Sequence, residues 1–453
     1  MTLWIKRPTR WQEAMAHNYF SNKTLAVQNV PQAIVLPPIK PKNRPNDYVG
    51  GCVCNAQQKW LAGLTRAPKN APFEPDCWGF LDSYKVHPQH LSYRKEEVIF
   101  GGVLIHHFGH CLIESFNRIW WLLQNPHEKR KVVFVYASPW AFGGGGFVLE
   151  FLKLLNIQNF EIIEKPTQFQ SVLIPEECCQ TWWKYTQEYN FIYETLIFNA
   201  QKECAHLPVF PKIYLTHQQW QFGTKCVNEQ HFEAFFKALG FEIIAPETLS
   251  LKEQIYYLSH AKEVVCTMGT LSHLGLFCQP NTLFAVLTRK PDAVLAVQAL
   301  IFQARKLNAH IIDATENFLP DHFTHGIAHL VMNDNFKNFI HHVYGNKASE
   351  LILQFAPPSC DYVKTWAKYY STPHFYKEIA HYCAFDLIAK MAYETNGIVL
   401  DKNLYAPTFL RRSLRTLRFA VRFVFAKTVP RCVKNWLKKH LLKSKKLSQM
   451  LGI

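Results

Sequence analysis

The residues with the clearest catalytic potential follow an apolar run, Val98 to Ile105, that predicts a buried strand. His110, Glu114 and Arg118 come next at intervals of four, so on a helix they share one face. A histidine at a helix N-terminus feels the positive end of the helix dipole, which favours its neutral, proton-accepting form. A carboxylate one turn later could orient that imidazole or act as the base itself, and the arginine could hold the carboxylate or contact a ligand. This set suits deprotonation of a hydroxyl nucleophile.

The same residues allow two other interpretations. His110 and Glu114 could form a satisfied polar pair beneath an interface between two lobes. His106, His107 and His110 also invite a zinc site, but zinc needs three or four convergent ligands and the spacing fits no established zinc pattern. We therefore predict neither a metal site nor a cofactor.

A second segment pairs a strand with a turn and a helix. Glu263 to Cys266 predicts a strand and Leu271 to Phe277 a helix, and between them lies a tight turn made of Thr267, Met268, Gly269 and Thr270. Backbone N–H groups and the dipole at such a helix start can receive phosphate oxygens, with Ser272 and His273 adding donors. The sequence contains no D-x-D pair, so the commonest carboxylate cage for a metal–diphosphate complex is missing. Helix dipole and basic side chains would have to neutralise a bound diphosphate.

Both segments lie in stretches where predicted strands and helices alternate. In the first stretch the strands are 98–105, 131–136, 160–163 and 171–174, with helices at 109–123 and 147–156. In the second the strands are 212–215, 241–244, 263–266 and 282–287, and helices begin after Asn228, at the capping box of Ser250 and Glu253, and at Leu271. This alternation predicts an α/β protein with two doubly wound, Rossmann-like lobes and a cleft between them. Ligands bind such sheets at the carboxyl ends of the strands.

The resulting domain prediction has five parts. They are an N-terminal arm with the start of the first lobe (1–95), a first lobe (96–208), a second lobe (209–330), a helical return segment (331–407) and a basic tail (408–453). Five prolines within residues 31–50 favour an extended arm across the surface. Residues 177–208 are expected to cross between the lobes.

Positive charge is concentrated at the C-terminus. The chain has 453 residues with 50 Lys and Arg against 34 Asp and Glu, and residues 408–453 hold six Arg and seven Lys with no acidic residue. Apolar residues recur there at helical spacing with basic residues on the flank, which predicts a basic amphipathic helix on an anionic membrane surface. A helix packed on the body is the alternative. Nucleic acid is not expected as a partner, because phosphate binding has no use for exposed Leu and Trp.

The remaining composition bears on localisation. Residues 1–20 contain no apolar core before a small-residue cleavage site, and no apolar run approaches the ~18–20 residues that cross a bilayer. The 13 cysteines include no C-x-x-C pair, which favours reduced thiols. We expect a cytoplasmic protein, peripheral on the inner membrane face.

The two segments together resemble glycosyltransferase family 61, whose members share a G-H-x-x-x-E-x-x-x-R helix in the first lobe. Gly109, His110, Glu114 and Arg118 match that helix. The second-lobe series also matches in order: Tyr214-Leu215-Thr216, Asn228-Glu229, Gly240-Phe241, Pro246-Glu247, Ser250-Leu251 with Gln254, the Gly269 turn, Leu276-Phe277 and Pro280. The resemblance covers about residues 96–290. It implies a GT-B-like fold, inversion at the anomeric carbon, independence from metal and a nucleotide sugar held mainly by the second lobe.

Two positions depart from the family pattern. Thr216-His217 stands where the family usually has Ser-Arg, so the arginine expected to bind diphosphate is missing there. Cys266-Thr267-Met268-Gly269 stands where the family usually has G-P-H-G, and His273 could supply the imidazole one turn later.

The resemblance therefore implies an inverting, metal-independent glycosyltransferase, a hexosyl- or pentosyltransferase. It would use a nucleotide-sugar donor and a glycan or lipid-linked glycan acceptor, in capsule or lipopolysaccharide biosynthesis. The expected catalytic residues are His110, Glu114 and Arg118, and the expected donor-binding residues are Thr216, His217, Glu247, Thr267, Met268, Gly269, Thr270, Ser272 and His273. The alternative is a non-catalytic membrane-surface scaffold with a transferase-like body, which the two altered positions favour.

Overall fold

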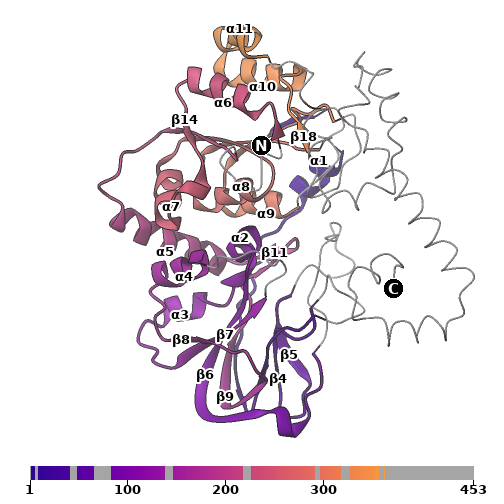
Figure 1. The fold of residues 1–453 in the computed structure, drawn as a ribbon, viewed down its shortest axis with the longest axis vertical. Coiled ribbons are helices and arrows are strands. Elements are labelled where there is room, and N and C mark those ends of the chain that lie inside the picture. The colour runs from indigo at the N-terminus through magenta and orange to yellow at the C-terminus, as the bar shows by residue number, and fades with distance from the viewer. Residues whose placement is uncertain are drawn as a thin grey trace, which may run out of the picture. The chain divides into compact units, whose positions relative to one another are not determined.

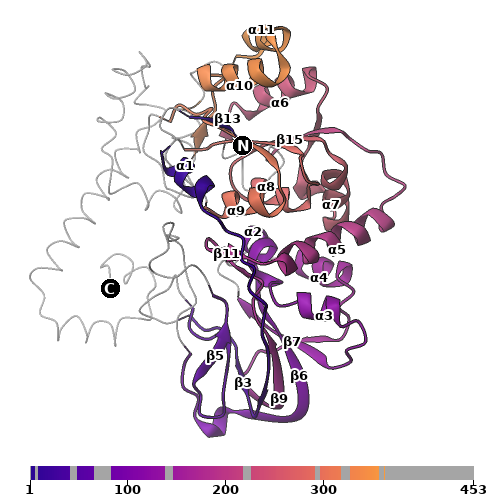
Figure 2. The same ribbon diagram turned by 180° about the vertical axis from the view of Figure 1, so that it is seen from behind.

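The computed structural model describes residues 2–5, 9–40, 48–65, 83–137, 146–217, 226–290, 296–317, 327–356 and 362. They belong to one unit, Met1–Asn317 with Phe323–Tyr362, and the remaining segments, Phe318–His322 and Val363–Ile453, form a second. The predicted basic tail (408–453) and most of the helical return segment (331–407) therefore lie outside the described residues. Within the first unit two sheets are separated by helices, and further helices lie on the far side of the upper sheet (Figures 1 and 2).

The first sheet is mixed rather than wholly parallel. Its strand order is β5 (Trp60–Gly63), β4 (Cys52–Cys54), β3 (Ile34–Leu36), β9 (Thr167–Pro175), β6 (Ser92–Ile105), β7 (Lys131–Ala137) and β8 (Phe160–Ile162), with β2 (Val27–Pro31) also paired to β9. The predicted parallel strands β6, β7, β8 and β9 are confirmed. The other four strands pair antiparallel, so this lobe departs from the predicted doubly wound pattern.

The proline-rich stretch at 31–50 contributes a strand to this sheet, so its described residues do not form the predicted surface arm. Its strand β3 is fully buried and pairs with β4 and β9. Pro31 ends β2 and Pro37 follows β3, so these two prolines sit at strand ends, where the missing N–H costs no ladder bond. These two prolines mark the ends of short strands rather than an extended arm.

The second sheet has six parallel strands. Their order is β14 (Glu242–Ile244), β12 (Lys212–Leu215), β15 (Glu263–Thr267), β16 (Leu283–Leu287), β17 (Asn308–Ile312) and β1 (Thr2–Trp4). Because β1 joins this sheet, the predicted segment 1–95 contributes strands to both sheets. Strand order reverses between β12 and β15, and ligands of open α/β sheets bind at such a switch point.

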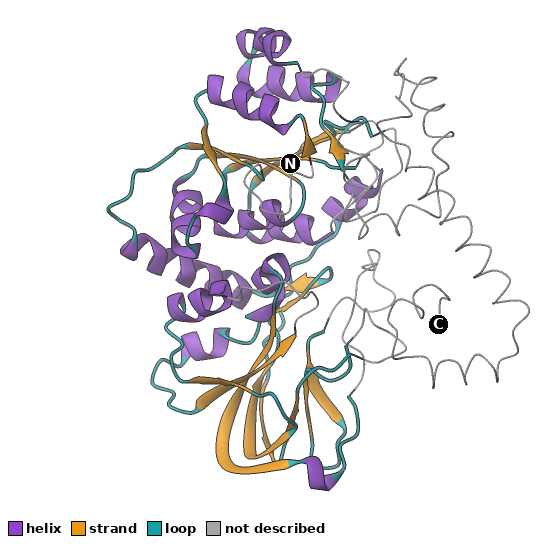
Figure 3. Cartoon of the chain, in the orientation of Figure 1, coloured by secondary structure: helices purple, strands orange, loops and turns teal. Residues whose placement is uncertain are grey.

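Helices cover the sheets and fill the space between them (Figure 3). The longer ones are α1 (Thr9–Ala16), α4 (Gly146–Leu154), α5 (Gln187–Glu203), α6 (Glu229–Ala238), α7 (Leu251–His260), α9 (Ala296–Ala304), α10 (Asp334–Tyr344) and α11 (Asn346–Phe355). The capping box predicted at the start of α7 is confirmed, with Ser250 N donating to Glu253 Oε2 at 2.8 Å. Among the described residues no helix is long and apolar enough to cross a membrane.

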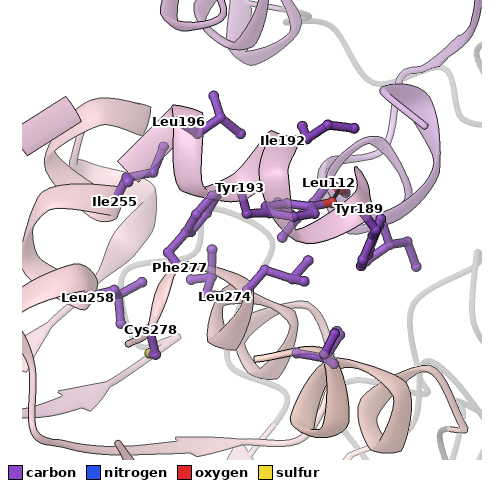
Figure 4. Close-up of a cluster of buried hydrophobic side chains, with 14 of the residues drawn as sticks. Leu112, Tyr189, Ile192, Tyr193, Leu196, Ile255, Leu258, Leu274, Phe277 and Cys278 are labelled. Atoms are coloured by element: carbon purple, nitrogen blue, oxygen red, sulfur yellow. Dashed lines mark hydrogen bonds between the residues drawn. The ribbon is translucent and has the colours of Figure 1, made fainter. Parts of the chain in front are cut away.

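Helix α5 lies within the predicted crossing, residues 177–208, and packs in a core shared by both sheets. Its residues Tyr189, Ile192, Tyr193 and Leu196 lie beside Leu112 of the first lobe and Leu274 and Phe277 of the second (Figure 4). The same hydrophobic cluster contains Leu104 of β6 and Val264 of β15. Burial of these side chains therefore fixes the ends of the two sheets relative to each other.

Candidate active site

Strand β6 leads into an irregular helical segment. It consists of α2 (Phe108–His110), a π-helical turn η2 (Cys111–Ser115) and α3 (Trp120–Gln124), where the sequence predicts one continuous helix over 109–123. Two carbonyl groups in the π-helical turn accept hydrogen bonds from side chains. The Tyr193 hydroxyl donates to Leu112 O, and Asn117 Nδ2 donates to Ile113 O at 3.3 Å. These bonds replace helical ones, which allows the π turn to persist.

His110 and Glu114 form a pair within this segment. His110 Nδ1 lies 2.8 Å from Glu114 Oε2. The Glu114 side chain is fully buried, whereas 18% of the His110 side chain is exposed. If Nδ1 carries the proton toward Glu114, the lone pair that can accept another proton is on Nε2. The predicted pairing of these two residues is confirmed.

Arg118 does not hold Glu114. Its Nη2 donates to Gly63 O at 2.7 Å, its Nη1 donates to Pro175 O, and Nη2 lies 3.8 Å from Glu177 Oε2. Burial lowers the pKa of Arg118 and raises the pKa of Glu177. The π turn shifts the helical phase, so Arg118 leaves the face of His110 and Glu114 and ties β5 to β9 instead.

The second predicted segment folds into a braced turn. Strand β15 ends at Thr267, and Gly269 has φ +134°, a conformation that glycine adopts readily. The buried Ser272 hydroxyl donates to Gly269 O at 2.7 Å and accepts from Gly269 N at 3.3 Å. Ser272 was expected to bind donor, and in the structure its side chain stabilises the turn.

The helix after this turn is much shorter than predicted. Instead of a helix over 271–277, one α turn, α8 (Thr270–His273), is followed by a 3-10 turn, η4 (Leu274–Phe277). Few peptide dipoles are aligned in so short an element, so its dipole contributes little positive potential. Most of the charge that neutralises a diphosphate would have to come from side chains.

The two segments meet. A Cβ atom placed on Gly109 would lie 2.9 Å from Thr270 Oγ1 and 3.4 Å from His273 Nδ1. Both ring nitrogens of His273 are buried and have no hydrogen-bond partner among the described residues. Burial, with a smaller contribution from His110, lowers the pKa of His273 to about 3, so its ring is neutral and electrostatically coupled to the His110–Glu114 pair.

Three carboxylates gather at the carboxyl end of β12. The Thr216 hydroxyl donates to Glu233, and Glu233 and Glu247 both act electrostatically on the buried Glu229. Burial is the main cause that raises the pKa of Glu229 to about 8, and Arg289 opposes the shift. The predicted residues Thr216, His217 and Glu247 are thus found in acidic surroundings.

Sequence reasoning missed two of these residues, Glu233 and Arg289. Arg289 comes two residues after the apolar strand predicted over 282–287, and carboxyl strand ends are where ligands bind. Its place after a predicted strand is the sequence feature from which Arg289 could have been predicted as a site residue. Among the described residues, no group of three or more His, Cys, Asp or Glu is arranged to hold a metal ion.

Comparison with known proteins bears on the family. Residues 108–285 match the family model described as Glycosyltransferase 61. The matched residues include both the His110–Glu114 pair and the Gly269 turn. No curated protein matches the chain.

Proposed function

We propose that this chain is an inverting glycosyltransferase that moves a hexose or pentose from a nucleotide sugar to a glycan or lipid-linked glycan. The family match supports a glycosyltransferase. The observation that carries the proposal is the meeting of the two segments. A histidine–glutamate pair at the carboxyl end of β6 lies beside the Gly269 turn at the carboxyl end of β15.

His110 is the proposed base. With Nδ1 directed at buried Glu114, Nε2 is the ring nitrogen that would take the acceptor proton, and Glu114 would fix the ring and stabilise the imidazolium that forms. The acceptor oxygen forms a bond to C1 of the donor sugar as the bond from C1 to the diphosphate oxygen breaks on the opposite face. The acceptor proton passes to His110, and the nucleoside diphosphate leaves with the bonding electrons.

His273 is the proposed donor to the leaving group. A neutral imidazole still carries one N–H, and no described residue occupies either ring nitrogen of His273. A buried donor is oriented before reaction, so it can stabilise charge on the diphosphate without reorganisation. His273 would then replace the histidine of the G-P-H-G pattern that is usual in the resembled family.

The basic tail and the pathway remain proposals from the sequence. The 13 cationic residues of 408–453 would hold the enzyme on an anionic inner leaflet, where lipid-linked precursors of surface polysaccharide are assembled. Deleting Thr408–Ile453 should abolish co-sedimentation with vesicles that contain phosphatidylglycerol while leaving sugar transfer to a soluble acceptor intact. Continued sedimentation would contradict the tail's role.

The experiment that tests the proposed function is a binding panel. The purified full chain is titrated with UDP-, GDP-, CMP- and dTDP-linked sugars by calorimetry, with free sugars as the control. We expect saturable binding of one nucleotide class and no binding of free sugar. Binding of no nucleotide would favour the non-catalytic scaffold.

A further inference from the structure

The carboxyl end of β12 is a poor place for a diphosphate. Thr216 and His217 follow this strand in place of the Ser-Arg of the resembled family, and Thr216 is bonded to Glu233. Glu229 and Glu247 lie in the same cluster. Ionised carboxylates repel a pyrophosphate and protonated ones supply no positive charge, so the compensating cation must come from another strand.

Arg289 lies at the end of a strand close to the turn. Strand β15 lies between β12 and β16 in the sheet, and Thr267, the last residue of β15, is in register with Leu287, the last of β16. Met268 N donates to Leu287 O at 2.8 Å, which holds the start of the turn against the end of β16. Two residues after Leu287, the backbone of Arg289 is fixed by Asn317 Nδ2, which donates to its carbonyl at 2.8 Å.

The side chain of Arg289 lies near two buried residues. It interacts with the Cys226 thiol. Arg289 also acts on the buried Glu229. The side chain thus lies beside the acidic cluster at the carboxyl end of β12, while its backbone follows β16.

We propose that Arg289 is the residue that binds the diphosphate of the donor, so that the pyrophosphate lies over the ends of β15 and β16 and the carboxylates at β12 are left for neutral hydroxyl groups. The inference rests on the proposed function. A guanidinium matches two phosphate oxygens at once and keeps its charge when partly buried, which suits a site with little help from α8. The competing explanation is that Arg289 is only a structural partner of the buried Glu229.

The test separates the phosphate contribution from nucleoside binding. Calorimetry on the full chain compares the nucleoside, its monophosphate and its diphosphate, in the base series that the sugar panel selects. We expect Arg289→Ala to weaken diphosphate binding by about 10- to 100-fold and nucleoside binding by less than about 2-fold. Arg289→Lys should restore part of the loss. Arg94→Ala is the matched control, because Arg94 is also half-buried and paired with glutamates but lies near the amino end of β6, and it should change neither affinity.

Each outcome decides a different claim. If the unaltered chain binds no nucleotide, both the function and this inference fail. If Arg289→Ala weakens nucleoside and diphosphate equally, or leaves both unchanged, Arg289 is a structural partner of Glu229 and only this inference is overturned. Should Arg289→Ala not fold, Arg289→Lys alone decides, because a selective loss of diphosphate affinity supports the inference and an unchanged ratio of the two affinities refutes it.

Discussion

Gly109 and Thr270 touch across the two lobes, and the contact leaves no space for a side chain on Gly109. An added Cβ would approach Thr270 Oγ1 to 2.9 Å. The residue before the proposed base is therefore packed against the first residue after the Gly269 turn. This contact brings the segment of His110 against the Gly269 turn.

Gly109→Ala should separate these segments. Overpacking of this kind typically destabilises by about 1–3 kcal/mol, and it should lower sugar transfer beyond what the lost stability explains. Thr270→Ala removes the clashing hydroxyl, so the double variant should recover both properties. Chemical denaturation and transfer rates on the four proteins measure this, and failure of the double variant to recover would show that the contact does not control the site.

Arg118→Ala should act on folding rather than chemistry. Its guanidinium is bonded to two carbonyls and lies near buried Glu177, and removing one partner of a buried pair typically costs about 3–5 kcal/mol. Urea denaturation should show this loss, while folded protein keeps its transfer rate. Arg94→Ala, at a half-exposed ion pair, should cost about 1 kcal/mol or less. A fully stable Arg118→Ala protein without activity would return Arg118 to a catalytic role.

Glu229→Gln should change how stability depends on pH. The folded pKa of about 8 lies above the ordinary 4.5, so between these values the unfolded chain releases a proton that the folded chain keeps. Rising pH therefore removes stability through this group, by at most about 1.4 kcal/mol per pH unit. The variant has no such proton, so its stability relative to the unaltered chain should increase from pH 5 to pH 8. A constant difference over that range would show that Glu229 is already ionised when folded.

Metal removal should leave transfer unchanged. In the proposed mechanism Arg289 supplies positive charge and His273 supplies a hydrogen-bond donor to the leaving diphosphate. In other transferases a divalent ion stabilises that charge. Sugar transfer measured with EDTA and then with added Mg²⁺ or Mn²⁺ checks this. A large loss with EDTA that metal restores would contradict the assignment of these residues.

Local patterns in the sequence predict much of the fold and part of the site. Alternating apolar runs predict the parallel strands, and the capping box predicts the start of α7. The spacing of His110 and Glu114 predicts their contact. The π turn could not be predicted, because it depends on Tyr193, a residue 81 positions from Leu112 in the sequence. The same limit applies to Arg118, whose partners are Gly63 and Pro175, and to β1, which pairs with β17. Local periodicity carries no information on such long-range contacts.

The central claim is that His110 and Glu114 act in chemistry. The decisive measurement is the rate of sugar transfer by His110→Ala and Glu114→Gln, with thermal unfolding of each variant recorded in parallel. We predict a fall of about 10²–10⁴-fold in each, with the melting temperature close to that of the unaltered chain. Retained transfer by well-folded variants, or a rate that falls only in proportion to lost folding, would show that the pair is structural.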